Sequence, residues 1–157
     1  MGEEMDAATA YQSYSYPSHT GEGSIQARLY RSAPSTDSPP KRLPMVQVIH
    51  GMAEHMERYD PFCRYLARCG FTVCIQDLAG HGLSSSGDDR LGYFGEKDAV
   101  ACILDDIQET ADQARAILKN DSSRLMPEGW IILGHSMGSF IARLFCARPR
   151  SEEHTSE

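Results

Sequence analysis

The chain has 157 residues; 41% of them are hydrophobic, 24% are charged, and the formal net charge is -7. These values are typical of a soluble globular protein and fit one domain or part of one. The negative charge argues against nucleic acid as a partner. No apolar run reaches the length of about 18 residues that a transmembrane helix needs. The acidic residues 1–6 are unlike a secretory signal.

The cysteines indicate a reducing compartment. There are five, and none forms a Cys-x-x-Cys pair. An odd number of cysteines in apolar sequence favours reduced, buried thiols and a cytoplasmic protein, without a disulfide framework or a zinc site. The four in apolar sequence are Cys69, Cys74, Cys102 and Cys146.

The first 44 residues predict two strands and a loop. Three tyrosines at near-alternating positions between residues 11 and 16 indicate a short edge strand. Residues 24–30 alternate apolar and polar side chains, which is typical of a half-buried strand. Residues 32–44 contain four prolines among Ser, Thr and Asp, which indicates a loop between strands and not a domain boundary.

Two short apolar runs, residues 45–49 and 71–75, have the composition of central parallel strands. Between them, apolar residues three or four apart predict a helix that ends at Gly70. Its apolar stripe consists of Tyr59, Phe62, Leu66 and Cys69.

A longer helix is predicted after a polar loop over residues 85–95. One face carries an apolar stripe and the other is charged, as in a surface helix. The pairs Asp88–Asp89 and Asp105–Asp106 are expected to be solvated. The stripe consists of Val100, Ile103, Leu104, Ile107, Ala111, Ala114 and Ile117.

After a leading β-hairpin, the predicted elements alternate strand, helix, strand, helix, strand, helix. This order predicts an α/β fold with a mostly parallel sheet and helices on both faces. In such sheets, ligands bind at the carboxyl ends of the strands. His50-Gly51, Asp77 and Ser136 follow predicted strands, so we expect them at one edge of the sheet.

The apolar run 130–133 leads into Gly134-His135-Ser136-Met137-Gly138 and then into a helical pattern. Gly-x-Ser-x-Gly between a strand and a helix is the context of a nucleophile elbow. Gly134 and Gly138 are expected where strand and helix approach too closely for a Cβ. Ser136 is therefore the predicted nucleophile; the alternative is a glycine-rich turn with an incidental serine.

A serine nucleophile needs a base for its proton and N–H donors for the oxyanion that forms. We predict the backbone N–H groups of Met137 and Met52 as these donors. The alternative for His50-Gly51 is a tight turn without a ligand, which is compatible with the donor role. The spacing from His50 to Glu54-His55 is one residue longer than a zinc motif, so no metal site is expected.

Three motifs, in order, resemble the monoglyceride lipase and lysophospholipase branch of the α/β-hydrolases, also known as serine aminopeptidase-like hydrolases. The resemblance covers residues 25–149. The motifs are His50-Gly51-Met52-Ala53-Glu54-His55 with Arg58-Tyr59, Asp77-x-x-Gly80-His81-Gly82-x-Ser84, and Gly134-His135-Ser136-Met137-Gly138.

The resemblance implies an α/β-hydrolase fold and a serine esterase that cleaves acyl glycerols or lysophospholipids through an acyl-enzyme, without a cofactor. It implies Ser136 as nucleophile, Met52 and Met137 as oxyanion donors, and a structural role for Asp77 and residues 80–82. His135 is not expected to act as the base. The other motif histidines, His50, His55 and His81, are expected to be hydrogen-bonding loop residues.

Two other functions stay open. A broader carboxylesterase, a thioesterase or a peptidase can use the same scaffold, because a fold does not fix the substrate. A hydrolase-like protein that binds without catalysis is the second, and the intact elbow serine argues against it.

The triad of α/β-hydrolases follows the order Ser, Asp or Glu, His. Only 21 residues, 137–157, follow Ser136. We therefore expect residues 1–149 to be the N-terminal portion of an α/β-hydrolase domain, truncated before its lid and C-terminal strands and inactive alone. An unpaired apolar strand at 130–135 predicts self-association, and the resemblance implies peripheral membrane contact through the absent lid.

Residues 150–157 resemble the in-frame translation of a sequencing-library adapter, so we expect a non-native tail. A natural polar C-terminus is the alternative. The acidic residues and the histidine of this segment are crowded together without a strand or a glycine turn: Glu152, Glu153, His154 and Glu157.

Overall fold

The computed structural model describes residues 11–31, 39, 41–96 and 98–149. The proposed non-native tail at 150–157 and the central part of the proline-rich loop lie outside the described residues.

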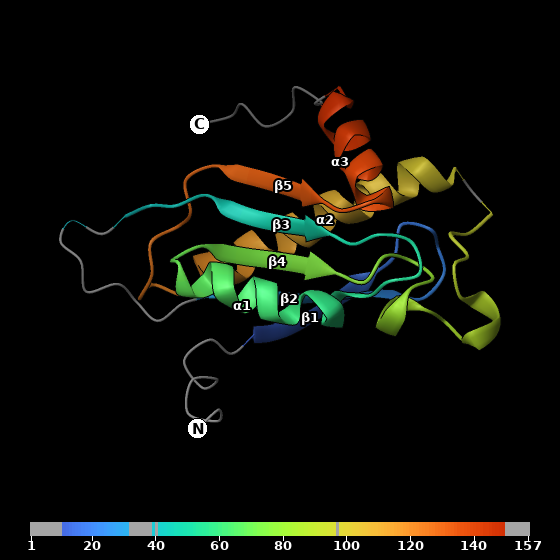
Figure 1. The fold of residues 1–157 in the computed structure, drawn as a ribbon, viewed down its shortest axis with the longest axis horizontal. Helices are drawn as coiled ribbons and strands as arrows, with labels where there is room; N and C mark the ends of the chain where they lie inside the picture. The colour runs from blue at the N-terminus through green and yellow to red at the C-terminus, as the bar shows by residue number, and fades with distance from the viewer. Residues whose placement is uncertain (1–10, 32–38, 40, 97, 150–157) are drawn as a thin grey trace.

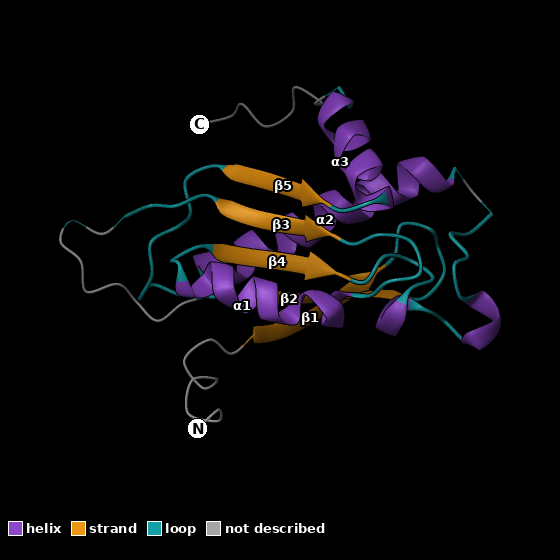
Figure 2. Cartoon of the chain, viewed as in Figure 1, coloured by secondary structure: helices purple, strands orange, loops and turns teal. Residues whose placement is uncertain are grey.

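A five-stranded mixed sheet forms the middle of the molecule, with the strand order β1-β2-β4-β3-β5 (Figures 1 and 2). β1 (Tyr11–Pro17) and β2 (Ser24–Tyr30) form an antiparallel hairpin. β3 (Met45–Ile49), β4 (Thr72–Gln76) and β5 (Trp130–Gly134) run parallel to one another. The predicted hairpin and the parallel strands are confirmed, and the hairpin joins the sheet through an antiparallel pairing of β2 with β4.

Helices cover both faces of the sheet, as predicted. α1 (Asp60–Arg68) packs on one face, while α2 (Ala99–Lys119) and α3 (Met137–Ala147) pack on the other. Short 3-10 helices lie in the connections: η2 (Met56–Tyr59), η3 (Gly82–Ser84) and η4 (Asp88–Arg90).

The core follows the twofold alternation of the strands. On β3, Val46 and Val48 face α1, whereas Met45 and Ile49 face α2 and α3. Because successive side chains of a strand point to opposite faces, a strand covered on both sides is apolar throughout. The exception is Gln47, which is fully buried and donates from Nε2 to the carbonyl of Ile107, 2.9 Å away.

The predicted apolar stripe of the first helix is confirmed in part. Cys63 and Ala67 are its buried residues, while Phe62 is 37% exposed and Cys69 is exposed. Tyr59 lies in η2, not in α1. Tyr59 and Leu66 of the predicted stripe do pack against the core on this face, but the buried residues of the face are Met56, Cys63 and Ala67.

Two further expectations are wrong. Cys69 and Cys146 are exposed, not buried; all five cysteines are free thiols. Asp106 is not solvated: it is 1% exposed on the inner face of α2. The Ser18 hydroxyl and the His19 N–H both donate to its carboxylate at 2.8 Å, which satisfies its oxygens, while burial raises its pKa.

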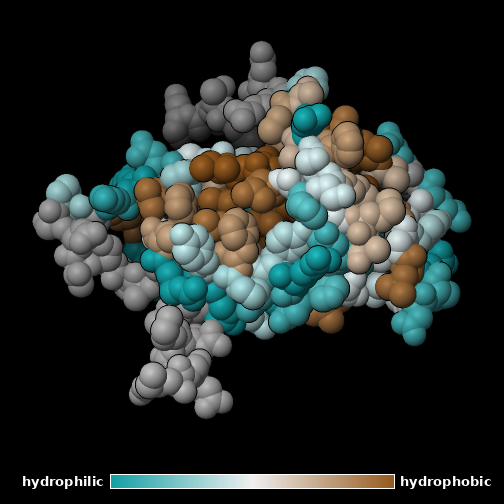
Figure 3. All heavy atoms as spheres, viewed as in Figure 1, coloured by the Kyte–Doolittle hydropathy of each residue, from teal (hydrophilic) through white to brown (hydrophobic). Residues whose placement is uncertain are grey.

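β5 pairs only with β3 among the described strands. Ile131 on this strand is 45% exposed, and Phe140 and Leu144 of α3 are 64% and 49% exposed. Figure 3 shows a continuous apolar area on the face of the molecule where β5 and β3 lie.

Candidate active site

Ser136 lies between the carboxyl end of β5 and the first turn of α3, with φ 54° and ψ -122°. Only one other described non-glycine residue, Ala53, has a positive φ. Such a backbone conformation costs free energy and persists where the surrounding structure enforces it. Ser136 is exposed, and its hydroxyl forms no hydrogen bond with another described residue.

Two glycines permit this turn. A Cβ on Gly134 would collide with the carbonyl of Gly138, and a Cβ on Gly138 would collide with the carbonyl of Ile49. The elbow therefore holds α3 directly against β5 and β3, as the motif predicts.

The loop after β3 lies against the elbow. A Cβ built on Gly51 would be 3.1 Å from the Cβ of Ser136 and 3.3 Å from the carbonyl oxygen of His135. Met52 is the next residue in this loop, and Met137 begins α3. The structure thus brings both proposed donor residues to the serine from two different strand ends.

The His50 ring fixes the start of this loop. Its Nε2 accepts the N–H of Leu78 at 3.0 Å, so the ring proton is on Nδ1, which donates to the carbonyl of Gly51 at 2.7 Å. The ring is fully buried, and burial lowers its pKa. The expected hydrogen-bonding role of His50 is confirmed.

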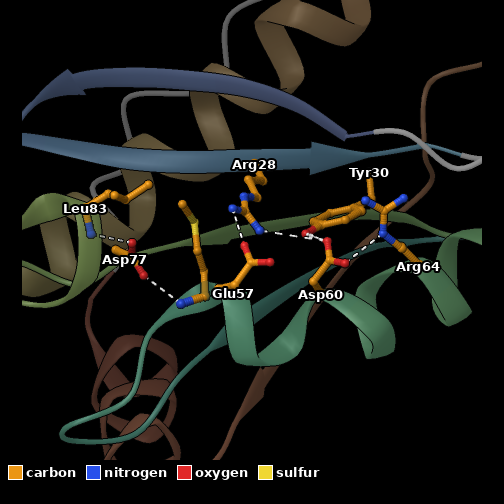
Figure 4. Close-up of polar contacts among 8 residues, drawn as sticks. Arg28, Tyr30, Glu57, Asp60, Arg64, Asp77 and Leu83 are labelled. Carbon is orange, nitrogen blue, oxygen red and sulfur yellow. Dashed lines mark hydrogen bonds and ion pairs between the residues drawn. The ribbon is translucent and has the colours of Figure 1, made fainter. Parts of the chain in front are cut away.

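Asp77 fixes the other end of the same loop. Its Oδ1 accepts the N–H of Met56 at 2.6 Å, and its Oδ2 accepts the N–H of Leu83 at 2.8 Å (Figure 4). A Cβ on Gly82 would collide with the Asp77 carboxylate. The structural role implied for Asp77 and the turn at residues 80–82 is therefore confirmed.

The two remaining motif histidines behave differently. His81 is buried, and its Nδ1 lies 3.0 Å from the carbonyl of Ala79, as expected. His55 is exposed, and its side chain forms no hydrogen bond with the described residues. The expectation for His55 is wrong because the loop turns its side chain into solvent.

A polar cluster beside the serine is not predicted by the sequence. The Tyr59 hydroxyl donates to Glu54 at 2.5 Å, and Nδ1 of His135 lies 3.2 Å from Glu54 and 3.0 Å from the Tyr59 oxygen. The hydrogen bond from Tyr59 lowers the pKa of Glu54. Burial, together with this carboxylate, raises the pKa of Tyr59 to about 12. All three residues belong to the quoted motifs, but their spacing does not reveal the contact.

The described residues place the predicted nucleophile, Ser136, beside the loop that carries one predicted donor residue, and no described side chain forms a hydrogen bond with its hydroxyl as a base would. His135 points one ring nitrogen at Glu54 and Tyr59. The described residues after Ser136, 137–149, include no His, Asp or Glu. Nor do any three His, Cys, Asp or Glu side chains in the described part of the chain lie close enough to hold a metal ion.

Residues 40–155 match the family described as serine aminopeptidase, S33. The chain belongs to this family. Its fold is that of the α/β-hydrolases, of which several solved structures are similar to it. A carboxyl esterase from Bacillus coagulans, solved with glycerol, is 29% identical, with a TM-score of 0.70 over 88% of this chain. A lipase in an open form is 33% identical, with a TM-score of 0.67 over 89% of this chain.

A curated relative of this S33 chain is an uncharacterized abhydrolase domain-containing protein of Dictyostelium discoideum, 31% identical over 102 residues. That alignment covers 65% of this chain and 9% of the relative. The chain spans 40% of the esterase and 41% of the lipase. No helix among the described residues is long and apolar enough to cross a membrane.

Proposed function

We propose that this chain supplies the nucleophile and oxyanion hole of a serine hydrolase that cleaves carboxylic esters of the monoacylglycerol or lysophospholipid type. The observation that carries the proposal is the position of Ser136. It has a strained backbone at the carboxyl end of β5, which pairs in parallel with β3, and Gly51 lies against its Cβ. This is the arrangement of a nucleophile elbow.

The proposed reaction proceeds through an acyl-enzyme. The Ser136 hydroxyl oxygen attacks the ester carbonyl carbon while a base takes its proton, and the carbonyl oxygen becomes an oxyanion. The N–H groups of Met52 and Met137 stabilise this oxyanion. The alcohol leaves with the proton, and water then releases the fatty acid by the same steps.

We infer that the base and the acid that orients it come from sequence after the described residues, because residues 137–149 offer neither. In this fold they follow the nucleophile along the chain. The active unit is therefore the whole protein.

The similar lipase and carboxyl esterase, both above 25% identity, support ester hydrolysis. The finer substrate class rests on the motif resemblance. The broader candidates are a carboxylesterase, which the esterase favours, and an aminopeptidase, which the family description favours. The five free thiols support a cytoplasmic location as part of the same proposal.

A substrate panel with the whole protein tests the proposal. The panel holds a long-chain monoacylglycerol, a lysophosphatidylcholine, p-nitrophenyl acetate and an aminoacyl p-nitroanilide, each assayed with wild type and Ser136→Ala. We expect the highest kcat/KM for one of the two lipids and no turnover by the variant. A kcat/KM that is highest for p-nitrophenyl acetate would favour a general esterase. A kcat/KM that is highest for the aminoacyl p-nitroanilide would favour a peptidase. No turnover of any substrate would favour a binding protein.

A further inference from the structure

We propose that His50 and Asp77 are positioning residues that aim the Met52 N–H at the site of the oxyanion. They do so by tying both ends of the loop between β3 and η2 to a single turn after β4. The inference rests on the proposed function and names two side chains, neither of which contacts the substrate.

The first tie orients a peptide group. The proton on His50 Nδ1 is directed to the Gly51 carbonyl because Nε2 is occupied by the Leu78 N–H. In a trans peptide, the carbonyl of Gly51 and the N–H of Met52 lie in one plane and point in opposite directions. A carbonyl held against the His50 ring therefore directs the Met52 N–H away from that ring.

The Met52 amide starts beside the nucleophile. The Cα of Gly51 is close enough to Ser136 that an added Cβ would lie 3.1 Å from the serine Cβ. Since two donors must converge within about 3 Å of one oxyanion, rotation of the Gly51–Met52 peptide alone would remove one of them. The hydrogen bond from His50 prevents that rotation.

The second tie holds the end of the loop. Asp77 accepts the Met56 N–H at 2.6 Å with one oxygen and the Leu83 N–H at 2.8 Å with the other. Asp77 is 1% exposed, and its own N–H donates to the carbonyl of Gln26 in β2 at 2.9 Å. The Ser84 hydroxyl donates to the Asp77 carbonyl at 2.7 Å. Asp77 is thus fixed on every side.

A third contact supports the same end. The buried Arg28 of β2 forms an ion pair with Glu57 at 2.5 Å, one residue beyond the Met56 contact (Figure 4). Tyr30 donates to Asp60 at 2.7 Å from the same strand. The start of η2 and α1 is therefore attached to the sheet. Between the two ties, Glu54 is also held, because it accepts hydrogen bonds from the Tyr59 hydroxyl at 2.5 Å and from the Gly51 N–H at 3.5 Å.

The two ties share one support. Leu78 binds His50 and Asp77 binds Met56, so two consecutive residues after β4 determine where the loop begins and ends. A shift of this turn would move the Met52 N–H relative to Ser136, whereas Met137 would keep its place in α3. The role of Asp77 and His50 is thus specific to one of the two donors.

Asp77→Asn in the whole protein is the test. The variant keeps the side-chain shape but replaces one acceptor oxygen with an NH₂ group that faces a backbone N–H. We expect kcat, expressed per site titrated with a fluorophosphonate, to fall about 10- to 100-fold, because misplacing one donor weakens only the transition state. KM should stay within about 2-fold.

Asp106→Asn is the matched control. Asp106 is also 1% exposed and also accepts two hydrogen bonds, but it lies on α2 and contacts the β1–β2 turn. We expect its Tm to fall while its kcat per titrated site stays within about 2-fold of wild type, because a hydrogen bond remote from the oxyanion stabilises the fold and not the transition state.

His50→Leu is the test if Asp77→Asn does not fold. A leucine side chain has no N–H donor, so the Gly51 carbonyl loses its hydrogen bond from residue 50, and kcat should fall about 10-fold or more at unchanged KM. Wild-type kcat in the folded variants, with Ser136→Ala inactive, would overturn the inference alone. Wild-type activity of Ser136→Ala would overturn the proposed function and the inference with it.

Discussion

The absence of a Cβ at Gly138 is a packing requirement of the elbow. An alanine Cβ there would collide with the carbonyl oxygens of Ile49, the last residue of β3, and of His50, which follows it; both are backbone atoms and cannot rotate away as a side chain can. We predict that Gly138→Ala lowers the free energy of unfolding by about 1–3 kcal/mol, as overpacking does. Chemical denaturation of wild type and Gly138→Ala measures this difference in the free energy of unfolding.

Gly87→Ala is the control for that substitution. Its added Cβ would meet only the end of the Asp89 side chain, and its backbone is extended. We expect Gly87→Ala to change the free energy of unfolding by no more than about 0.5 kcal/mol. Equal losses for the two variants would show that the close approach at Gly138 has no special cost.

We predict that the buried ring of His50 makes the free energy of unfolding depend on pH. Its folded-state pKa is lowered by burial, while the unfolded value is about 6.5. Below about pH 6.5 the unfolded chain binds a proton that the folded chain does not, so stability falls as the pH is lowered, by at most about 1.4 kcal/mol per unit.

Denaturation of the 157-residue chain between about pH 7.5 and 5.5 measures this dependence. His50→Gln should have the smaller slope, and His55→Gln, at an exposed position, should keep the wild-type slope. Equal slopes for wild type and His50→Gln would contradict the assignment.

Some side chains were predictable and others were not. Ser136 and its glycines follow from a local motif, because strand, turn and helix are adjacent in the chain. The contact of Glu54 with His135 joins residues 81 positions apart, and no periodicity reveals such a contact. The burial of Asp106 could not be predicted from the sequence, because its hydrogen-bond partners, Ser18 and His19, lie in a turn 87 to 88 residues earlier.

Among the elements, β5 is the strand whose free edge we expect to pair with another chain. Its sequence, Trp130–Gly134, contains no charge or proline, and it pairs on one side only among the described strands. An unprotected apolar edge favours pairing with another chain. We predict that the 157-residue chain self-associates at micromolar concentration and that Ile131→Lys shifts it toward monomer. Sedimentation velocity measures both.

Leu91→Lys is the matched control, because Leu91 is 62% exposed but lies in a loop away from β5. It should leave the association unchanged. A wild-type chain that stays monomeric with a cooperative thermal transition would contradict the prediction.

The strands were predicted to within one or two residues, since continuous apolar runs and turn residues bound them. The pairing of β2 with β4 was not predicted, because strand order in the sheet depends on contacts between distant segments. The face of α1 was predicted only in part: Leu66 packs against the core, but Cys63 and Ala67 are the buried residues, because a short apolar stripe fits more than one register and packing on β3 and β4 selects one.

At the scale of the molecule, the described residues provide the proposed nucleophile, Ser136, and no base hydrogen-bonded to it. We predict that the 157-residue chain hydrolyses short p-nitrophenyl esters no faster than its Ser136→Ala variant, because a serine hydroxyl is a weak nucleophile until a base takes its proton. Initial rates at matched concentration test this. A clear difference would mean that a resident residue acts as the base, and His81 would be the first to replace.

The central claim is that Ser136 is the nucleophile of the whole protein. Labelling with a fluorophosphonate, followed by intact-mass and peptide mass spectrometry, tests it most directly, because the probe phosphonylates an activated serine. We predict one adduct per chain, on the peptide that contains Ser136, and none in Ser136→Ala. An adduct on another serine, or equal labelling and ester hydrolysis by Ser136→Ala, would contradict the claim.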